Sequence, residues 1–224
     1  MIKLRAEIAT NEQLIAALAN SAFDFIYAPT ELLCSETKHK LRIIAVPPVF
    51  QTQLPDLKAM GFKSALAHTL GHIELIKNAG LNVHGGFRLN ITNSLSQKKY
   101  EELGLIDSIF SVELSCKSIE TIKHGIPVGV ISYGKMPLML TRRCPVYDNK
   151  HCGKSGCSAL TDRFGNRLQT HCRQGESEIL NPVPLFLEEA PADFAALKFT
   201  AGEKVTTNPE PKNFTRGLYN RRAR

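Results

Sequence analysis

Residues 63–86 have the sequence KSALAHTLGHIELIKNAGLNVHGG, in which a short apolar segment, an amphipathic segment and a second short apolar segment follow one another. The pattern predicts strands over residues 63–67 and 81–84, with a helix over residues 70–78 between them. Gly80 follows the helix directly, which is the usual place for a helix-ending glycine. Strand–helix–strand units of this kind build parallel sheets that are covered on both faces.

The same unit recurs along the chain. Further strands are predicted over residues 3–8, 23–27, 41–46, 107–112 and 128–132, and further helices over 11–19, 53–60, 94–103 and 117–124. Seven strands, most of them followed by helices, predict an α/β protein with a (β/α) TIM-like barrel. A doubly wound open sheet is the alternative, although no G-x-G-x-x-G motif supports it. No helix is expected between Tyr27 and Leu41, so the barrel is expected to be incomplete.

Three regions differ in composition. Residues 1–140 are expected to form the barrel-like domain, residues 141–187 a cysteine-rich segment packed on it, and residues 188–224 a C-terminal extension. In the extension, residues 191–197 can form a helix, with an extended piece at residues 198–200. The net charge of +7 favours an anionic partner such as nucleic acid, with solubility as the plainer explanation. With no signal peptide and no run of 18 apolar residues, we expect a cytoplasmic protein that does not bind a membrane.

Four of the six cysteines lie close together, with the spacing C-x7-C-x4-C-x14-C. Glycine, lysine and short polar residues separate them, so this segment cannot be ordered by burying apolar surface. Four thiolates on one metal centre would order it. Uneven spacing without a C-x2-C pair favours an iron–sulfur cluster over zinc, while disulfides or unrelated thiols are further alternatives. The four are Cys144, Cys152, Cys157 and Cys172; Cys34 and Cys116 are interpreted as small apolar fillers.

Polar residues follow the predicted strands at their carboxyl ends, where ligands bind in parallel α/β folds. Asn90 and Asn93 offer amide donors and acceptors there, although Asn93 can equally serve as a helix cap. Glu113 and Tyr133 follow two other strands and, with Asn90, are the candidate catalytic residues. We expect these three residues to lie in one pocket facing the cysteines. The alternative role for Glu113 is that of a helix cap. No nucleophile elbow and no H-E-x-x-H motif supports hydrolysis.

Several short segments together resemble one family. They are HGGFRLNITNS (84–94), SVELS (111–115), YGKMPLM (133–139) leading into RCP (143–145), LTDRFG (160–165), CR (172–173) and ILN (179–181). In this order they resemble the peptidase U32, or collagenase-like, family over residues 2–187. A short closing motif of the family resembles residues 214–219, which include Arg216.

The resemblance implies a (β/α) barrel. It also implies an enzyme, because several members of the family are hydroxylases of ubiquinone, of tRNA wobble uridine or of ribosomal RNA cytidine. Characterised members hold a [4Fe-4S] cluster on four cysteines, and prephenate is implicated as their oxygen source. By position the ligands here would be Cys144, Cys152, Cys157 and Cys172. The residues that we expect to contact the substrate are Asn90, Asn93, Lys135 and Arg173. We therefore expect an iron–sulfur-dependent hydroxylase acting on RNA, with prephenate or another small aromatic acid as a further ligand.

Other functions remain open. A U32-type peptidase follows from the family name, and a metal-stabilised RNA-binding module is the non-catalytic alternative. Two departures from the family bear on the choice: Lys135 stands where the family usually has arginine, and an opening motif of the type Leu-Ala-Pro-Ala-Gly is lacking. Lysine cannot grip a carboxylate or phosphate with two hydrogen bonds. The chain is thus interpreted as the second unit of a longer protein, a fragment or a divergent short member, with a partner subunit as one option.

Overall fold

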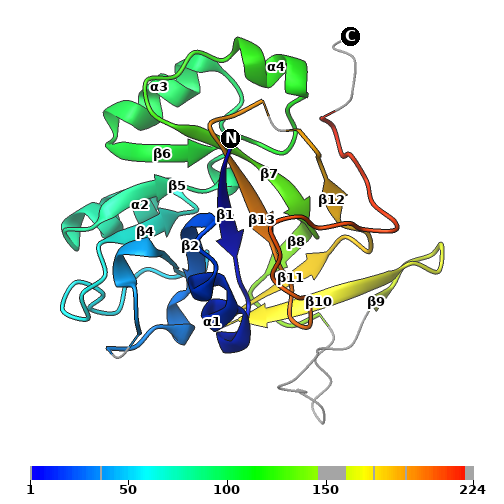
Figure 1. Cartoon of the computed structure of the whole chain (residues 1–224), viewed down its shortest axis with the longest axis horizontal. Helices are drawn as coiled ribbons and strands as arrows, with labels where there is room; N and C mark the ends of the chain where they lie inside the picture. Colours follow the sequence, from blue (N-terminus) through cyan, green and yellow to red (C-terminus); the bar gives the residue numbers. More distant parts are fainter. Residues whose placement is uncertain (1, 36, 146–159, 174, 190, 220–224) are drawn as a thin grey trace.

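The computed structural model describes residues 2–35, 37–145, 160–173, 175–189 and 191–219. Eight parallel strands close into a barrel, in which each strand pairs with the next and the last returns to the first (Figure 1). In spatial order they are β1 (Lys3–Glu7), β2 (Phe23–Pro29), β3 (Ile43–Val46), β4 (Ser64–Ala67), β5 (Asn82–Gly85), β6 (Leu105–Ile109), β7 (Val128–Gly134) and β13 (Phe194–Lys198). The predicted TIM-like barrel is confirmed.

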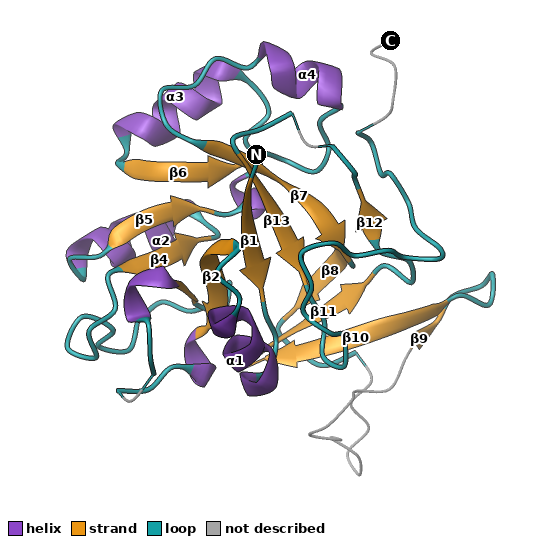
Figure 2. Ribbon diagram, in the orientation of Figure 1, coloured by secondary structure: helices purple, strands orange, loops and turns teal. Residues whose placement is uncertain are grey.

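Four α-helices lie outside the barrel, after β1, β4, β5 and β6 (Figure 2). They are α1 (Asn11–Ala19), α2 (Leu70–Asn78), α3 (Ser94–Glu102) and α4 (Cys116–Thr121). Each begins at a polar cap, whose side-chain oxygen accepts a hydrogen bond from a backbone N–H of the first turn. Thr10 and Gln13 form a capping box at the start of α1. Among the described residues, no helix has the length and apolar character that a membrane span requires.

Two predicted helices are wrong. Residues 53–60 form turns instead, because Pro55 lacks a backbone N–H and a segment this short is marginal as a helix. Residues 194–198 form strand β13, which pairs with β1 on one side and β7 on the other. Two neighbouring strand edges therefore outweigh the helix propensity of Ala195 and Ala196. As expected, the described residues between β2 and β3 form no α-helix. The ring of strands is nevertheless closed, because the C-terminal extension provides the eighth strand.

The chain between β7 and β13 forms a second sheet in place of a helix. Its strands run antiparallel in the order β8 (Pro137–Thr141), β11 (Glu176–Leu180), β10 (Arg167–Arg173) and β9 (Leu160–Thr161). We call it the cover sheet, because β10 and β11 face the carboxyl ends of the barrel strands and enclose a cavity with them. Strand β12 (Leu185–Phe186) then pairs with β7 and leads the chain back to β13.

The barrel interior holds a buried polar network as well as apolar side chains. The guanidinium of Arg5 contacts Asp107 at 2.8 Å and donates to the hydroxyl of Tyr27 at 2.8 Å. Its flat face lies 3.5 Å from the ring centre of Phe194, and Asp107 also contacts Nδ1 of His84. Burial raises the pKa of Asp107, but His84 and Arg5 together hold it below its usual value. The ion pair is therefore charged although it is buried, and neither partner can be removed without leaving the other uncompensated.

Candidate functional site

A cavity lies at the carboxyl ends of the barrel strands, beneath the cover sheet, and we call it the mouth cavity. Its walls come from the ends of β1, β2, β3 and β13, from the loops after β3, β4 and β5, and from β10 and β11. Its volume is about 30 Å³. A single water needs about 10–15 Å³, so the cavity has room for roughly two waters in this conformation.

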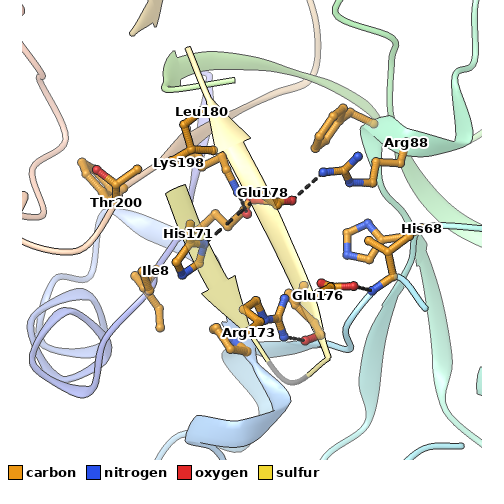
Figure 3. Close-up of a pocket in the computed structure, with 17 residues that line it drawn as sticks. Ile8, His68, Arg88, His171, Arg173, Glu176, Glu178, Leu180, Lys198 and Thr200 are labelled. Carbon is orange, nitrogen blue, oxygen red and sulfur yellow. Dashed lines mark hydrogen bonds and ion pairs between the residues drawn. The ribbon is translucent and has the colours of Figure 1, made fainter. Parts of the chain in front are cut away.

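Glu178 is the central charged residue of the mouth cavity. It points from β11 toward the barrel, where Arg88 donates to its Oε1 at 2.5 Å and Nδ1 of His171 lies 3.9 Å from Oε2 (Figure 3). Burial raises the pKa of Glu178, but the charge of Lys198, the nearby His171 and the charge of Arg88 hold it far below its usual range. Glu178 is therefore ionised, and its contact with Arg88 joins β11 to the loop after β5 of the barrel.

Lys198 lies at the end of β13 and forms an ion pair with Glu7 at the end of β1. Burial lowers the pKa of Lys198, yet the charges of Glu7 and Glu178 raise it above its usual value overall. Glu7, Lys198, Glu178 and Arg88 thus alternate in sign across the cavity. Because each charge has an opposite neighbour, the cavity presents a compensated polar surface rather than a strongly cationic one.

His68 differs from the other polar residues of the cavity because its ring lacks a hydrogen-bond partner at Nδ1 among the described residues. The side chain follows β4 and is buried, at 8% exposure. Burial lowers its pKa well below 6.5, and the charge of Arg88 lowers it further. His68 is therefore neutral at pH 7, and it is one of the residues that line the cavity.

Two further residues attach the cover sheet to the barrel. Arg173 on β10 donates to both carboxylate oxygens of Glu31 at 2.8 Å and to the carbonyl of Val46 at 2.7 Å. Glu176 on β11 accepts hydrogen bonds from the backbone N–H groups of Val49 at 2.7 Å and Phe50 at 3.3 Å. Together with Glu178, they hold the sheet in one position over the strand ends.

Two of the four predicted cysteine ligands lie within the described residues, next to this site. Cys172 is on β10, beside Arg173, and Cys144 follows β8; their Sγ atoms are 3.8 Å apart. Ser177 on β11 also donates to the sulfur of Cys172 at 3.3 Å. Cys152 and Cys157 lie outside the described residues, and the described part of the chain holds no group of three or more residues arranged to bind a metal ion. Of the two cysteines predicted as apolar fillers, Cys116 is half-buried but Cys34 is exposed, which corrects that interpretation for Cys34.

A thiolate–metal distance near 2.3 Å in tetrahedral geometry places two sulfurs about 3.8 Å apart. Cys144 and Cys172 therefore fit two ligands of one metal centre. The separation is that of a single tetrahedral ion, whereas a cluster binds its cysteines on separate irons, further apart. Cysteine thiolates are ligands of both zinc and iron–sulfur clusters, however, so metal analysis has to distinguish the two.

The candidate catalytic residues fall into two places. Asn90 accepts a hydrogen bond from Ser111 at 2.6 Å, and the backbone N–H of Glu113 donates to the same hydroxyl at 3.2 Å. Tyr133 instead donates to Glu203 at 3.1 Å and lies against Phe199, and burial first, then Glu203, raises its pKa to about 12. The structure thus brings Asn90 and Glu113 to the same hydroxyl, that of Ser111, while Tyr133 pairs with Glu203, and none of the three lines the mouth cavity.

Of the predicted substrate contacts, Arg173 lines the mouth cavity. Asn93 is the cap of α3, and Lys135 donates to Gln169 of β10 at 3.1 Å. Most of the residues that do line the cavity were not predicted from the sequence, chiefly Glu7, Arg88, Glu176, Glu178 and Lys198. Their one available signal was a charged residue inside or directly after an apolar strand segment, as in ESEIL (176–180) and FAALK (194–198).

The fold and the site define a (β/α) barrel protein in which a small antiparallel sheet bearing cysteines covers the carboxyl ends of the strands. The sequence model of peptidase family U32 matches residues 48–159, which is half of the chain. The chain belongs to peptidase family U32. Comparison with curated proteins and with solved structures found no match.

Proposed function

We propose that this U32-family protein is a cytoplasmic iron–sulfur-dependent hydroxylase that acts on a base of RNA. The observation that carries the proposal is the approach of Cys144 and Cys172 to 3.8 Å on the cover sheet, which supports a shared metal centre. A cluster rather than a single ion is proposed because the cysteine spacing is uneven and lacks a C-x2-C pair. Cys172 is adjacent to Arg173, which lines the mouth cavity, so a metal centre held there would sit beside the cavity. The net charge of +7 supports an anionic substrate.

Cys144, Cys152, Cys157 and Cys172 would hold the cluster, and a bound cluster supplies one-electron redox chemistry. The residues of the cavity have separate tasks. Arg173, Glu176 and Glu178 hold the cover sheet against the strand ends, and neutral His68 offers a hydrogen bond to a bound group. The cavity is too small for prephenate or another aromatic acid as it stands, so binding such a ligand would need the cover sheet to move outward.

The peptidase alternative receives less support from the site. A hydrolytic nucleophile needs a neighbouring base, and among the described residues no serine or cysteine lines the mouth cavity. Thr200 lines it, but its hydroxyl donates to Glu203, whose carboxylate also accepts from the backbone N–H of Thr200. That arrangement is a local turn contact rather than an activated nucleophile.

Metal and sulfide analysis of anaerobically purified protein tests the cluster. We expect about four irons and four sulfides per chain, compared with about one zinc if a single ion is bound. Cys172→Ser should lose most of the bound metal, whereas Cys116→Ser, a half-buried cysteine outside the cover sheet, should retain it. Full iron content in Cys172→Ser would remove that residue from the ligand set.

Analysis of nucleosides tests the reaction. RNA from cells with and without the protein is digested and analysed by mass spectrometry, and a hydroxylated nucleoside is expected in the first sample alone. Complementation with Cys172→Ser should leave that nucleoside absent, and complementation with Cys116→Ser should restore it. Digestion of casein by the purified protein, with no change in any nucleoside, would favour the peptidase alternative.

A further inference from the structure

A second hollow lies beside the cover sheet, outside the mouth cavity, and we call it the α2 groove. Its walls are the loop after β3, the first two turns of α2 and Arg142, which follows β8. Its volume is about 440 Å³, which is within the range of small-molecule sites. The guanidinium carbon of Arg142 lies 4.6 Å from the ring centre of Phe50, so the groove has a planar cation stacked on an aromatic ring as one wall.

The aromatic wall is held in place from two sides. Glu176 of the cover sheet accepts hydrogen bonds from the backbone N–H groups of Val49 and Phe50. On the other side, Nε2 of the buried His72 lies 3.1 Å from the carbonyl oxygen of Gln51. The loop therefore cannot shift without breaking contacts to both β11 and α2, and Phe50 is positioned before any ligand arrives.

The groove also contains an unmet hydrogen-bonding group. The side-chain oxygen of Gln51 is buried and has no partner among the described residues, although Gln51 lines the groove. A buried amide oxygen without a donor is costly, so such groups in native structures usually indicate a bound water or ligand. Glu74 and Asn78 on the exposed face of α2 add further acceptors and donors along the same wall.

We propose that the α2 groove binds a nucleobase of single-stranded RNA, stacked on the Arg142–Phe50 pair with an N–H group donated to Gln51. The inference rests on the proposed function. The α2 groove would hold the nucleotide next to the one that reacts. A base has the flat face that arginine and phenylalanine stack on and the N–H donors that an amide oxygen accepts. Arg143, exposed beside Arg142, provides the positive charge for the adjoining phosphate.

The location agrees with this role. Arg142 precedes Cys144 by two residues, and Glu176 connects Phe50 to the same sheet that carries Cys172. A base in the groove therefore lies on the sheet that would hold the metal centre. An uncharged peptide could also stack on Phe50, but the net charge of +7 and the arginine pair favour an anionic chain.

Fluorescence anisotropy with the full chain, purified anaerobically, tests the proposal. The probes are a labelled single-stranded RNA of twelve nucleotides and a strand of equal length whose ribose–phosphate units lack bases. Phe50→Leu and Arg142→Lys remove the aromatic face and the planar cation while keeping apolar character and charge. The control is Arg163→Lys, because Arg163 stacks on Phe164 at 4.7 Å on the β9–β10 hairpin, which projects away from the barrel (Figure 1).

We expect Phe50→Leu and Arg142→Lys to weaken binding of the base-bearing RNA about tenfold, with no change on the abasic strand. Arg163→Lys should bind both strands like the parent protein. Thermal unfolding of each variant checks that a loss is local. The proposal is overturned if both groove variants bind the base-bearing RNA as the control does, although RNA as the substrate class would then still stand.

Two other results would also overturn the groove proposal, and a second measurement distinguishes them. If the parent protein binds no RNA at low salt, the groove assignment fails together with the RNA substrate, while the iron and sulfide content decides the cluster independently. If a twelve-residue uncharged peptide with one tryptophan displaces the RNA, and Phe50→Leu lowers the affinity for the peptide alone, the groove is a peptide site. In that case the peptidase alternative gains support.

Discussion

At the scale of single residues, Glu178 has several charged neighbours at the barrel mouth. It contacts Arg88 and His171 directly and lies in the field of Lys198. Buried charges of this kind contribute little over a well-packed apolar alternative, but removing one of them leaves the others uncompensated. The three residues that attach the cover sheet are all charged. The attachment of the sheet to the barrel therefore depends on paired opposite charges and not on apolar burial alone.

Glu178→Gln should therefore destabilise the protein by about 3 kcal/mol, because Arg88 and Lys198 lose the charge that offsets theirs. The free energy of unfolding in urea measures the change. Glu102→Gln is the matched control, since Glu102 pairs with Lys99 at 3.2 Å on an exposed helix surface and should cost less than about 1 kcal/mol. Equal losses in the two variants would show that the mouth ion pairs are no more important than surface ones.

His68 predicts a pH dependence whose sign follows from its lowered pKa. The folded protein keeps His68 neutral, whereas the unfolded chain takes up a proton below about pH 6.5, so this residue makes stability fall as the pH falls. Between pH 7.5 and 5.5 the loss attributable to His68 is about 1.4 kcal/mol. Between these two pH values, the free energy of unfolding of His68→Gln should fall less than that of the parent protein, by the same amount. His124→Gln, at an exposed position, should show the drop of the parent protein.

At the scale of elements, the barrel depends on strand β13, which is about 60 residues beyond β7 in the chain but adjacent to it in space. Phe194 at its start extends across β7 at Gly129 and stacks on Arg5. A Cβ at Gly129 would lie 2.1 Å from the Phe194 ring, so the glycine is required by close packing.

Gly129→Ala should thus displace Phe194 and destabilise the barrel by about 1–3 kcal/mol, the usual cost of overpacking. Chemical denaturation measures it. Gly71→Ala makes the same change in the first turn of α2, where the nearest atom outside the helix backbone is 3.9 Å away, and should be neutral or slightly stabilising. A neutral Gly129→Ala would show that Phe194 has room to move and that β13 is held mainly by its backbone pairing.

At the scale of the whole molecule, the net charge of +7 and the exposed Arg142 and Arg143 predict electrostatic binding of RNA. The last thirteen residues carry five basic side chains, Lys212, Arg216, Arg221, Arg222 and Arg224, of which the last three lie outside the described residues. If several phosphates are neutralised, the logarithm of the RNA affinity should fall steeply and linearly with the logarithm of the salt concentration.

Arg143→Ala should flatten that slope by about 0.7, the value for one phosphate contact on a single strand. Titrations at a series of salt concentrations measure the slope. Lys117→Ala removes one exposed charge on α4, away from the cover sheet, and should leave the slope nearly unchanged. Equal effects of the two substitutions would indicate attraction to the net charge alone, without a defined path for RNA past the cysteines.

The sequence by itself determined the repeated strand–helix units and, through them, the barrel. It did so because apolar periodicity, helix caps such as Thr10 and helix-ending glycines such as Gly80 act within a few residues. The cysteine spacing indicated a common metal centre, which stays a prediction, and the structure brings two of the four cysteines, Cys144 and Cys172, to 3.8 Å. The predicted substrate contacts also stay predictions; a polar residue after a strand can equally serve as a cap, as Asn93 does.

Only the tertiary structure decided which segment closes the barrel and which charges meet at its mouth. Residues 194–198 are a strand because β1 and β7 each leave an edge free beside them, and no local pattern contains that information. Glu178 faces Arg88 and Lys198 because the pairing register of β10 and β11 turns that side chain, rather than its neighbours, toward the barrel. A shift of one residue in a strand reverses every side chain, so the composition of the site depends on contacts between distant parts of the chain.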